Sequence, residues 1–447
     1  MTIRSRPPVT LVPAKLGIMD ATPVSVTNCE IAPRSPRYHS LDFWRGLACL
    51  LVIVYHGTYY LSLENHNAIW TPFLQGIQLL WLGVPFFFVI SGYCIAAAVD
   101  SSRRRGNTLS YFVRRFRRIY PPFWIFLALT GVLVFITEAW LRPHFFMDRN
   151  HPIYAPQSLN AWQWIGNLTL IETWRENLFG PVGRFFMGHA WTLCYEEQFY
   201  IVMGVLLLLF PRRLFVASAV VTVFCFAARH LLARLDVPFQ GFFFDGHWPI
   251  FAAGILVYYQ INYGSPRRLW LSAGVLLLGL CYSLRETPIW NDGYVTDTAG
   301  VFAFSFALLL LFLHRYDGKM ASSKIVQPFA FCGTMCYSLY LVHWPVVKII
   351  GSSFNLLGAN GAVFTFLVTI PLCVAASILC AYQFHMHIER RFLNLASHRD
   401  ITRSNIFTQT VRHQGDWLTR DEISPTSTGS TSSGSVSAGS ASSAGSR

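Results

Sequence analysis

The chain has 447 residues, of which 53% are hydrophobic and only 13% are charged. Several apolar runs are long enough to cross a hydrocarbon core, which takes about 20 residues of helix, and they lack the short alternating pattern of barrel strands. The composition therefore excludes a water-soluble globular protein and predicts an all-α fold, a polytopic membrane helix bundle. The net charge of +13 indicates contact with lipid headgroups, so we expect the lipid bilayer as a partner and no nucleic acid.

The apolar runs divide the chain into three predicted parts. Residues 1–37 contain no apolar core followed by a cleavage site, so we expect a disordered cytoplasmic segment and no removed signal peptide. Residues 38–392 form the predicted transmembrane domain, and 393–447 form a polar, Ser/Gly-rich cytoplasmic tail without a core. About ten transmembrane helices are predicted, at 43–61, 76–99, 121–140, 189–210, 214–232, 248–262, 268–284, 298–314, 326–351 and 360–388.

Basic residues gather in alternate loops between these spans. If the amino terminus is cytoplasmic, the inner loops contain the arginines at 103–118, 212–213 and 267–268, whereas the outer loops at 62–75 and 351–359 contain no Lys or Arg. An excess of basic residues marks the cytoplasmic side of a membrane protein. Both termini are therefore predicted to be cytoplasmic.

The first predicted span carries two ionisable residues, Arg45 and His56. Eleven residues separate them, which is close to three helical turns, so both side chains project from one face about 16 Å apart. Ionisable residues are costly inside a membrane and tend to line a protein interior or a water-filled path. Both are therefore candidate site residues.

An arginine-dense segment precedes the third span. Arg115 and Arg118 are three residues apart, so on a helix they share a face and could bind phosphates through paired hydrogen bonds. The alternative is that they only anchor the protein at the cytoplasmic surface. The prolines Pro121 and Pro122 follow, at the point where we expect the helix to begin.

Two adjacent carboxylates, Glu196 and Glu197, open the fourth span. They point in different directions on a helix, so at most one faces the same cavity as His56. That carboxylate could pair with Arg45 or another cation, or it could take part in the chemistry.

Three further histidines lie at or within the spans. His343, in the ninth span, is either an interior histidine with satisfied hydrogen bonds or a functional one, whereas His189 and His247 are expected at the outer surface. The ten cysteines are scattered and show no paired metal-ligand spacing, so no metal site is predicted. In the long connection 141–188, tryptophans and the carboxylate of Glu172 are candidates for contact with a sugar, although the tryptophans also suit a membrane-interface belt.

A series of ordered motifs resembles the acyltransferase 3 family of integral-membrane enzymes. The residues that carry the resemblance are Arg45 and His56, GVPFFFVISG at 83–92, RRFRRIYPP at 114–122, WTLCYEEQFY at 191–200, YSLYLVHWP at 337–345 and HIERRF at 387–392. The chain departs from the family in two places. The family often shows Ser-Leu-Ser-Val before the glutamate, where this chain has Thr192 to Tyr195, and it often ends with Glu-Arg-Pro, where this chain has Glu389 to Arg391. The resemblance covers 38–392 and suggests a stand-alone form without the SGNH domain of some members.

This resemblance implies O-acylation of a cell-surface or exported glycan, or of a lipid-linked saccharide, at the bacterial inner membrane. The donor would be cytoplasmic acyl-CoA, with acetyl-CoA the expected form, and no metal is implied. Family membership would make His56 the general base, with transient acylation of His56 as an alternative. Arg45 would be a structural or phosphate-proximal partner, and Glu196 would orient His56 or a sugar hydroxyl.

The remaining candidate residues would complete the site. Arg115 and Arg118 would bind the phosphates of acyl-CoA. The substrate cavity would be walled by Ser91, Tyr337, Tyr340 and His343. Two other classes of function stay open at this point, a secondary transporter or exporter of a small anionic or glycan substrate, and a lipid- or glycan-binding membrane protein without catalysis.

Overall fold

The computed structural model describes residues 38–61, 71–147, 152–235, 240–286 and 295–393. The predictions for 1–37 and for the tail after residue 393 lie outside these residues. The described part of the chain is helical and contains no strand, so the predicted all-α class is confirmed. The helices are α1 (Leu41–Gly57), α2 (Thr71–Gln78), α3 (Gly83–Arg104), α4 (Leu109–Ile136), α5 (Ala161–Thr169), α6 (Glu172–Leu178), α7 (Trp191–Leu209), α8 (Leu214–Arg234), α9 (Trp248–Tyr263), α10 (Pro266–Glu286), α11 (Val295–Leu313), α12 (Asp317–Ser322), α13 (Gln327–Thr334), α14 (Cys336–Leu356), α15 (Ala362–Phe364), α16 (Ile370–Phe384) and α17 (Arg390–Leu393).

Six helices among the described residues are long and apolar enough to cross a membrane, fewer than the ten predicted. They run over Pro72–Arg104, Leu109–Leu141, Gly188–Leu209, Pro211–Arg234, Thr298–Ser322 and Ala362–Leu393. The other four predicted spans are helical at the expected places, but each falls short for a physical reason. α1 and α9 have only 17 and 16 residues, and α10 has arginines near both ends. The ninth span breaks at Met335 into α13 and α14, and α14 carries polar residues such as His343 and Lys348 along its length.

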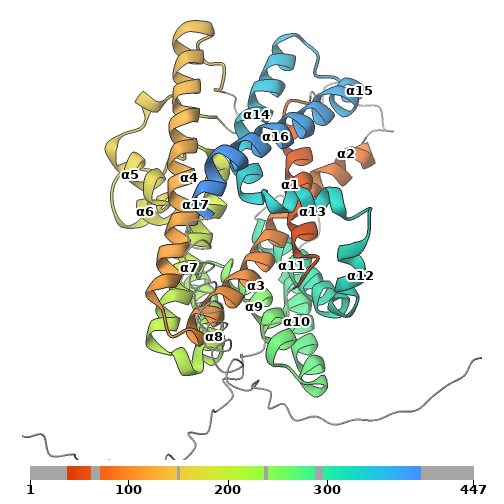
Figure 1. Cartoon of the computed structure of the whole chain (residues 1–447). Helices are drawn as coiled ribbons and strands as arrows, with labels where there is room; N and C mark the ends of the chain where they lie inside the picture. The colour runs from red at the N-terminus through yellow and green to blue at the C-terminus, as the bar shows by residue number, and fades with distance from the viewer. Residues whose placement is uncertain (1–37, 62–70, 148–151, 236–239, 287–294, 394–447) are drawn as a thin grey trace, which may run out of the picture. The chain divides into compact units, whose positions relative to one another are not determined.

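The long helix α4 corrects a second prediction. It begins at Leu109 and runs through Pro121 and Pro122, which were expected at its start. Membrane helices tolerate proline in their interior because neighbouring helices and side chains satisfy the carbonyls that lose a backbone partner. In Figure 1, α4 runs beside α5 and α6, and the indole of Trp124 donates to the carbonyl of Leu168 at 2.9 Å. The arginine-rich segment is therefore the first part of this helix.

Glycines set how closely the central helices approach each other. A Cβ at Gly46 of α1 would lie 1.8 Å from the carbonyl oxygen of Phe329 in α13, and a Cβ at Gly92 of α3 would lie 1.9 Å from that of Phe251 in α9. Only glycine allows backbones to pack at such distances. These glycines therefore hold α1 against α13 and α3 against α9.

Two buried carboxylates connect helix ends to neighbouring helices. Asp100 of α3 is fully buried and accepts hydrogen bonds from Tyr258 at 2.9 Å and Tyr263 at 2.7 Å, both on α9. Glu389, near the end of the last predicted span, is also buried, accepts from Ser338 of α14 and pairs with His385 at 2.8 Å. The buried carboxylates are paired and hydrogen-bonded, as burial of charge requires.

The connection between α4 and α7 folds back over the bundle. Glu172 and Arg175 form a fully buried ion pair, with Nε to Oε2 at 2.8 Å. The guanidinium of Arg175 also donates to the carbonyls of Phe179 and Pro181, each at 3.0 Å. Glu172 is thus occupied in holding this connection together, and its predicted contact with a sugar is wrong.

Candidate active site

Three histidines from separate parts of the chain meet in one cluster. The ring of His56, near the end of α1, stacks on the ring of His343 in α14, with centroids 5.4 Å apart and planes inclined by 23°. The edge of Trp344 meets the His56 ring at 4.8 Å. The ring of His189 lies 5.2 Å from that of His343. His56, His189 and His343 are called the histidine cluster below.

His189 corrects the expectation of an outer-surface position, since only 7% of it is exposed. It lies in the turn η4 (Gly188–Ala190) that begins the helix of Glu196, and the fully buried side chains of Phe186 and Met187 hold this turn inside the protein. No hydrophobic pattern in the sequence distinguishes this position from a membrane surface. A usable signal was its position two residues before Trp191, where the ordered motif at 191–200 begins.

The tautomer of His343 follows from its neighbours. Its Nδ1 lies 2.6 Å from the carbonyl oxygen of Tyr340 and 3.1 Å from that of Leu339. Carbonyl oxygens only accept, so Nδ1 carries the hydrogen and Nε2 has a lone pair. Within the described residues, Nε2 of His343 and Nδ1 of His189 are buried without a hydrogen-bond partner. These two ring nitrogens of the cluster could each form a hydrogen bond with a polar group that enters the site.

Tyr340 and Tyr337 connect the cluster to other helices. The hydroxyl of Tyr340 donates to the carbonyl of His189 at 2.7 Å and accepts from Thr192 at 3.0 Å. One helical turn earlier, the hydroxyl of Tyr337 donates to the carbonyl of Ile119 in α4 at 2.7 Å. Tyr340 thus lies beside the cluster, and Tyr337 faces the arginine-rich helix.

Glu196 belongs to a second group of side chains. It accepts hydrogen bonds from Ser91 of α3 and from Tyr200, the latter at 2.8 Å. Glu197 instead accepts from Tyr120 of α4 at 3.1 Å. The expectation that the two carboxylates diverge is confirmed.

The predicted phosphate-binding arginines approach this second group. The guanidinium of Arg115 lies over the ring of Tyr200, 4.7 Å from its centroid, a favourable cation–π contact. Arg118, three residues further along α4, is exposed. Side chains of α4, α7 and α14 thus extend from the arginines towards the histidine cluster.

Arg45 lies apart from the histidine cluster. Its guanidinium pairs with Asp42 at 2.8 Å and donates to the sulfur of Cys94 at 2.6 Å. Cys94 is three residues from Ser91 on α3, so it shares a helix face with that serine. Arg45 therefore connects α1 to α3 one turn from the Glu196 group, and its partner is Asp42 rather than a carboxylate of the fourth span.

His247 is the second histidine wrongly expected at the surface, since it is 8% exposed. Its Nδ1 donates to Asp245 at 2.7 Å, and its ring lies 4.1 Å from that of Tyr195. Burial alone would raise the pKa of Asp245, but the hydrogen bonds and charge of His247, with the hydroxyl of Tyr195, lower the pKa below its usual range. This pair fixes the start of α9 against α7.

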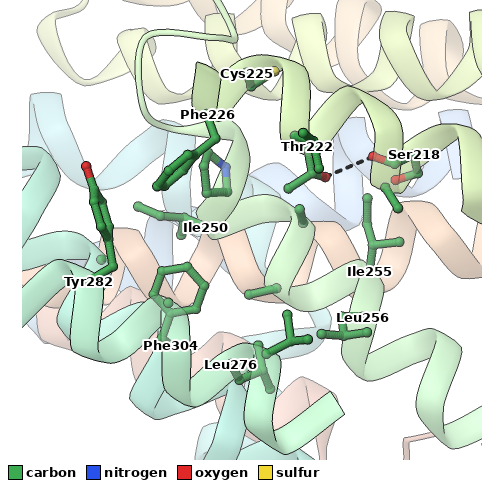
Figure 2. Close-up of a pocket in the computed structure, with 18 of the residues that line it drawn as sticks. Ser218, Thr222, Cys225, Phe226, Ile250, Ile255, Leu256, Leu276, Tyr282 and Phe304 are labelled. Carbon is green, nitrogen blue, oxygen red and sulfur yellow. Dashed lines mark hydrogen bonds between the residues drawn. The ribbon is translucent and has the colours of Figure 1, made fainter. Parts of the chain in front are cut away.

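A separate cavity of about 610 Å³ lies between α8, α9, α10 and α11 (Figure 2). None of the predicted site residues lines it. In the part of the chain that the structure describes, no group of three or more His, Cys, Asp or Glu side chains is arranged to hold a metal ion.

Buried histidines inside an apolar helical bundle are the kind of group that gathers at functional sites of membrane proteins. Residues 38–384 match the family model described as Acyltransferase domain, Acyl_transf_3. Because this match covers most of the chain, the protein belongs to the acyltransferase 3 family, and the resemblance found in the sequence is confirmed.

Proteins of similar sequence are named as O-acetyltransferases. The chain is 26% identical over 346 residues to O-acetyltransferase OatA of Staphylococcus aureus strain NCTC 8325, a match that covers 71% of this chain and 52% of that protein. O-acetyltransferase OatA of Staphylococcus aureus strain COL matches with the same identity and coverage. The chain thus spans about half the length of these relatives. No solved structure matches it.

Proposed function

We propose that this protein is a membrane-bound O-acyltransferase that moves an acetyl group from acetyl-CoA to a hydroxyl of a cell-surface or exported glycan. The observation that carries the proposal is the histidine cluster, where ring nitrogens of His189 in η4 and His343 in α14 are buried without a hydrogen-bond partner in the described residues, beside the ring of His56 in α1. Family membership favours the enzyme over the transporter and over a binding protein without catalysis. The names of the relatives favour acetyl as the group transferred.

In the proposed reaction, His56 acts as the general base. A ring nitrogen takes the proton of the acceptor hydroxyl as the oxygen attacks the thioester carbonyl. The new C–O bond forms, the C–S bond breaks, and the CoA thiolate leaves and takes up the proton from His56. An imidazole suits this role because its ordinary pKa of about 6.5 lies near physiological pH.

His343 and His189 extend this proposal beyond the residues that the sequence singled out as catalytic. The ring of His343 stacks on His56 and is fixed by its Nδ1 hydrogen bonds, so its Nε2 lone pair can accept a hydrogen bond from the acceptor. His189 is held by Tyr340 through its carbonyl. We assign both as residues that position the acceptor hydroxyl next to His56.

The direct test is the O-acetyl content of cell-surface glycans, measured by NMR before and after mild alkali. Cells should carry the intact gene, its deletion, His56→Ala, or the control His387→Ala, which changes an exposed histidine. We expect an alkali-labile signal with the intact gene and with His387→Ala, and its loss with His56→Ala. Full acetylation in the His56→Ala cells, at equal protein abundance, would overturn the catalytic role.

The proposed donor site is tested by removing one positive charge. Arg118→Gln should raise the KM for acetyl-CoA by roughly 10-fold and change kcat little, since a charge-assisted hydrogen bond to phosphate contributes about 1.5–3 kcal/mol. Arg117→Gln, on the same helix, is the control with the same change in charge. Equal KM values in both variants and the unaltered protein would remove Arg118 from the donor site.

A further inference from the structure

The cavity between α8, α9, α10 and α11 is elongated along α8. The residues of α8 that line it recur every three or four positions from Phe215 to Arg229. These 15 residues extend over roughly 21 Å at 1.5 Å per residue. That length exceeds one half of a hydrocarbon core about 30 Å thick. Since α8 belongs to one of the membrane-crossing helices, the cavity runs along the direction of the lipid chains.

The walls of this cavity are suited to hydrocarbon. Figure 2 shows Ile250, Leu256, Leu276 and Phe304 around it. Thr222, on the α8 wall, uses its hydroxyl within the protein, since it donates to the carbonyl of Ser218 at 2.9 Å and accepts from the indole of Trp248 at 3.0 Å. The middle of the cavity therefore attracts an apolar chain rather than a sugar or a nucleotide.

One end of the cavity is different, because a cation lies there. Arg229, which is half-buried, lines that end together with Gly246. A Cβ at Gly246 would lie 3.0 Å from the guanidinium of Arg229. Glycine at this position therefore leaves room for the arginine side chain. The hydroxyl of Tyr282, also on the lining, meets Nε2 of His230 at 2.9 Å. These residues lie where α8 and α10 end and α9 begins.

We propose that this groove binds one hydrocarbon chain of an anionic glycerophospholipid, with the phosphate of the headgroup at Arg229. An apolar groove of this length with a guanidinium at one end matches a lipid in both polarity and charge, and basic pockets between membrane helices bind anionic headgroups. A cavity of about 610 Å³ holds a single chain rather than a whole bilayer lipid. The site is independent of the proposed acyl transfer.

The experiment uses two exposed valines of α8. Val223 lines the groove and Val220 does not, although their exposed fractions are similar, 70% and 64%. Full-length protein should be purified in detergent, incubated with phosphatidylglycerol or phosphatidylcholine, and examined by native mass spectrometry. The variants are Val223→Trp, which fills the groove, Val220→Trp as its matched control, and Arg229→Gln.

We expect the unaltered protein and Val220→Trp to retain one phosphatidylglycerol, with at least 5-fold preference over phosphatidylcholine. Val223→Trp should bind phosphatidylglycerol at least 10-fold more weakly, and Arg229→Gln should lose the preference between the two lipids. Equal retention by Val223→Trp and Val220→Trp would overturn the groove as the site. No preference for phosphatidylglycerol in the unaltered protein would overturn the role of Arg229, and helix content measured by circular dichroism excludes unfolding as the cause.

Discussion

The histidine cluster combines one residue that the sequence pattern predicted as catalytic, one that it left open and one that it misplaced. His56 was predicted as a site residue because an ionisable side chain is costly inside an apolar span and usually has a function there. His343 had two open interpretations, and its buried Nε2 favours the functional one. His189 could not be placed from the sequence, because burial at the end of a span depends on how the preceding connection folds back. That fold depends on contacts distant in sequence, such as the hydrogen bond from Tyr340.

Replacing His343 by Asn separates its two nitrogens. The amide nitrogen of Asn can still donate to the carbonyl of Tyr340, as Nδ1 does at 2.6 Å, but nothing replaces Nε2. We expect normal abundance and melting temperature, with kcat lower by roughly 10²-fold, the lower part of the range for acid–base and positioning groups. Acetyl transfer by purified protein measures kcat. Unchanged kcat in a folded His343→Asn protein would show that Nε2 has no part in the reaction.

At the scale of helices, the positions of the apolar runs predicted where helices lie, but not their ends. The predicted span 121–140 became α4, which begins at Leu109, because the arginine-rich segment is helical although it is not apolar. The predicted span 326–351 became two helices separated at Met335. Hydrophobicity reports where lipid contacts a helix, whereas helix ends depend on local backbone partners and packing.

The glycine contacts between helices give a prediction about stability. Gly46→Ala should lower the melting temperature of the purified protein strongly, because its Cβ would lie 1.8 Å from the carbonyl oxygen of Phe329 and α1 must move away from α13. The control is Gly274→Ala in α10, where a Cβ meets nothing within 4 Å. Alanine stabilises an exposed helix by roughly 0.5–1 kcal/mol over glycine, so the control should be as stable as the unaltered protein or more so. Similar melting curves for both variants would contradict the close packing.

The start of α9 should make stability depend on pH. The pKa of Asp245 is lowered in the folded protein, so its carboxylate stabilises the fold above the pKa of the unfolded chain. That stabilisation is lost as pH falls through the lowered pKa of the folded state. Melting temperature measured from pH 7 to pH 3 should therefore fall more steeply for the unaltered protein than for Asp245→Asn. Parallel curves would show that Asp245 does not contribute.

At the scale of the whole molecule, the candidate residues form two groups on different helices, the Glu196 group and the histidine cluster. The two groups meet at α7 and α14. The arginine face of α4 approaches Glu196 through Tyr200, and the histidine cluster lies beside Tyr340. The sequence predicted these residues as one site but could not predict that Glu196 is bound by Ser91 and Tyr200. Hydrophobic periodicity gives the face of each helix, whereas the pairing of faces comes from packing of the whole bundle.

The measurement that tests the account most directly is release of CoA thiol from acetyl-CoA by purified protein in vesicles with a glycan acceptor. The unaltered protein and His387→Ala should release thiol at equal rates when the acceptor is present. His56→Ala should be slower by at least 10²-fold, within the range of 10² to 10⁴ that general acid–base groups contribute. Thiol release by His56→Ala at the rate of the unaltered protein would contradict the account.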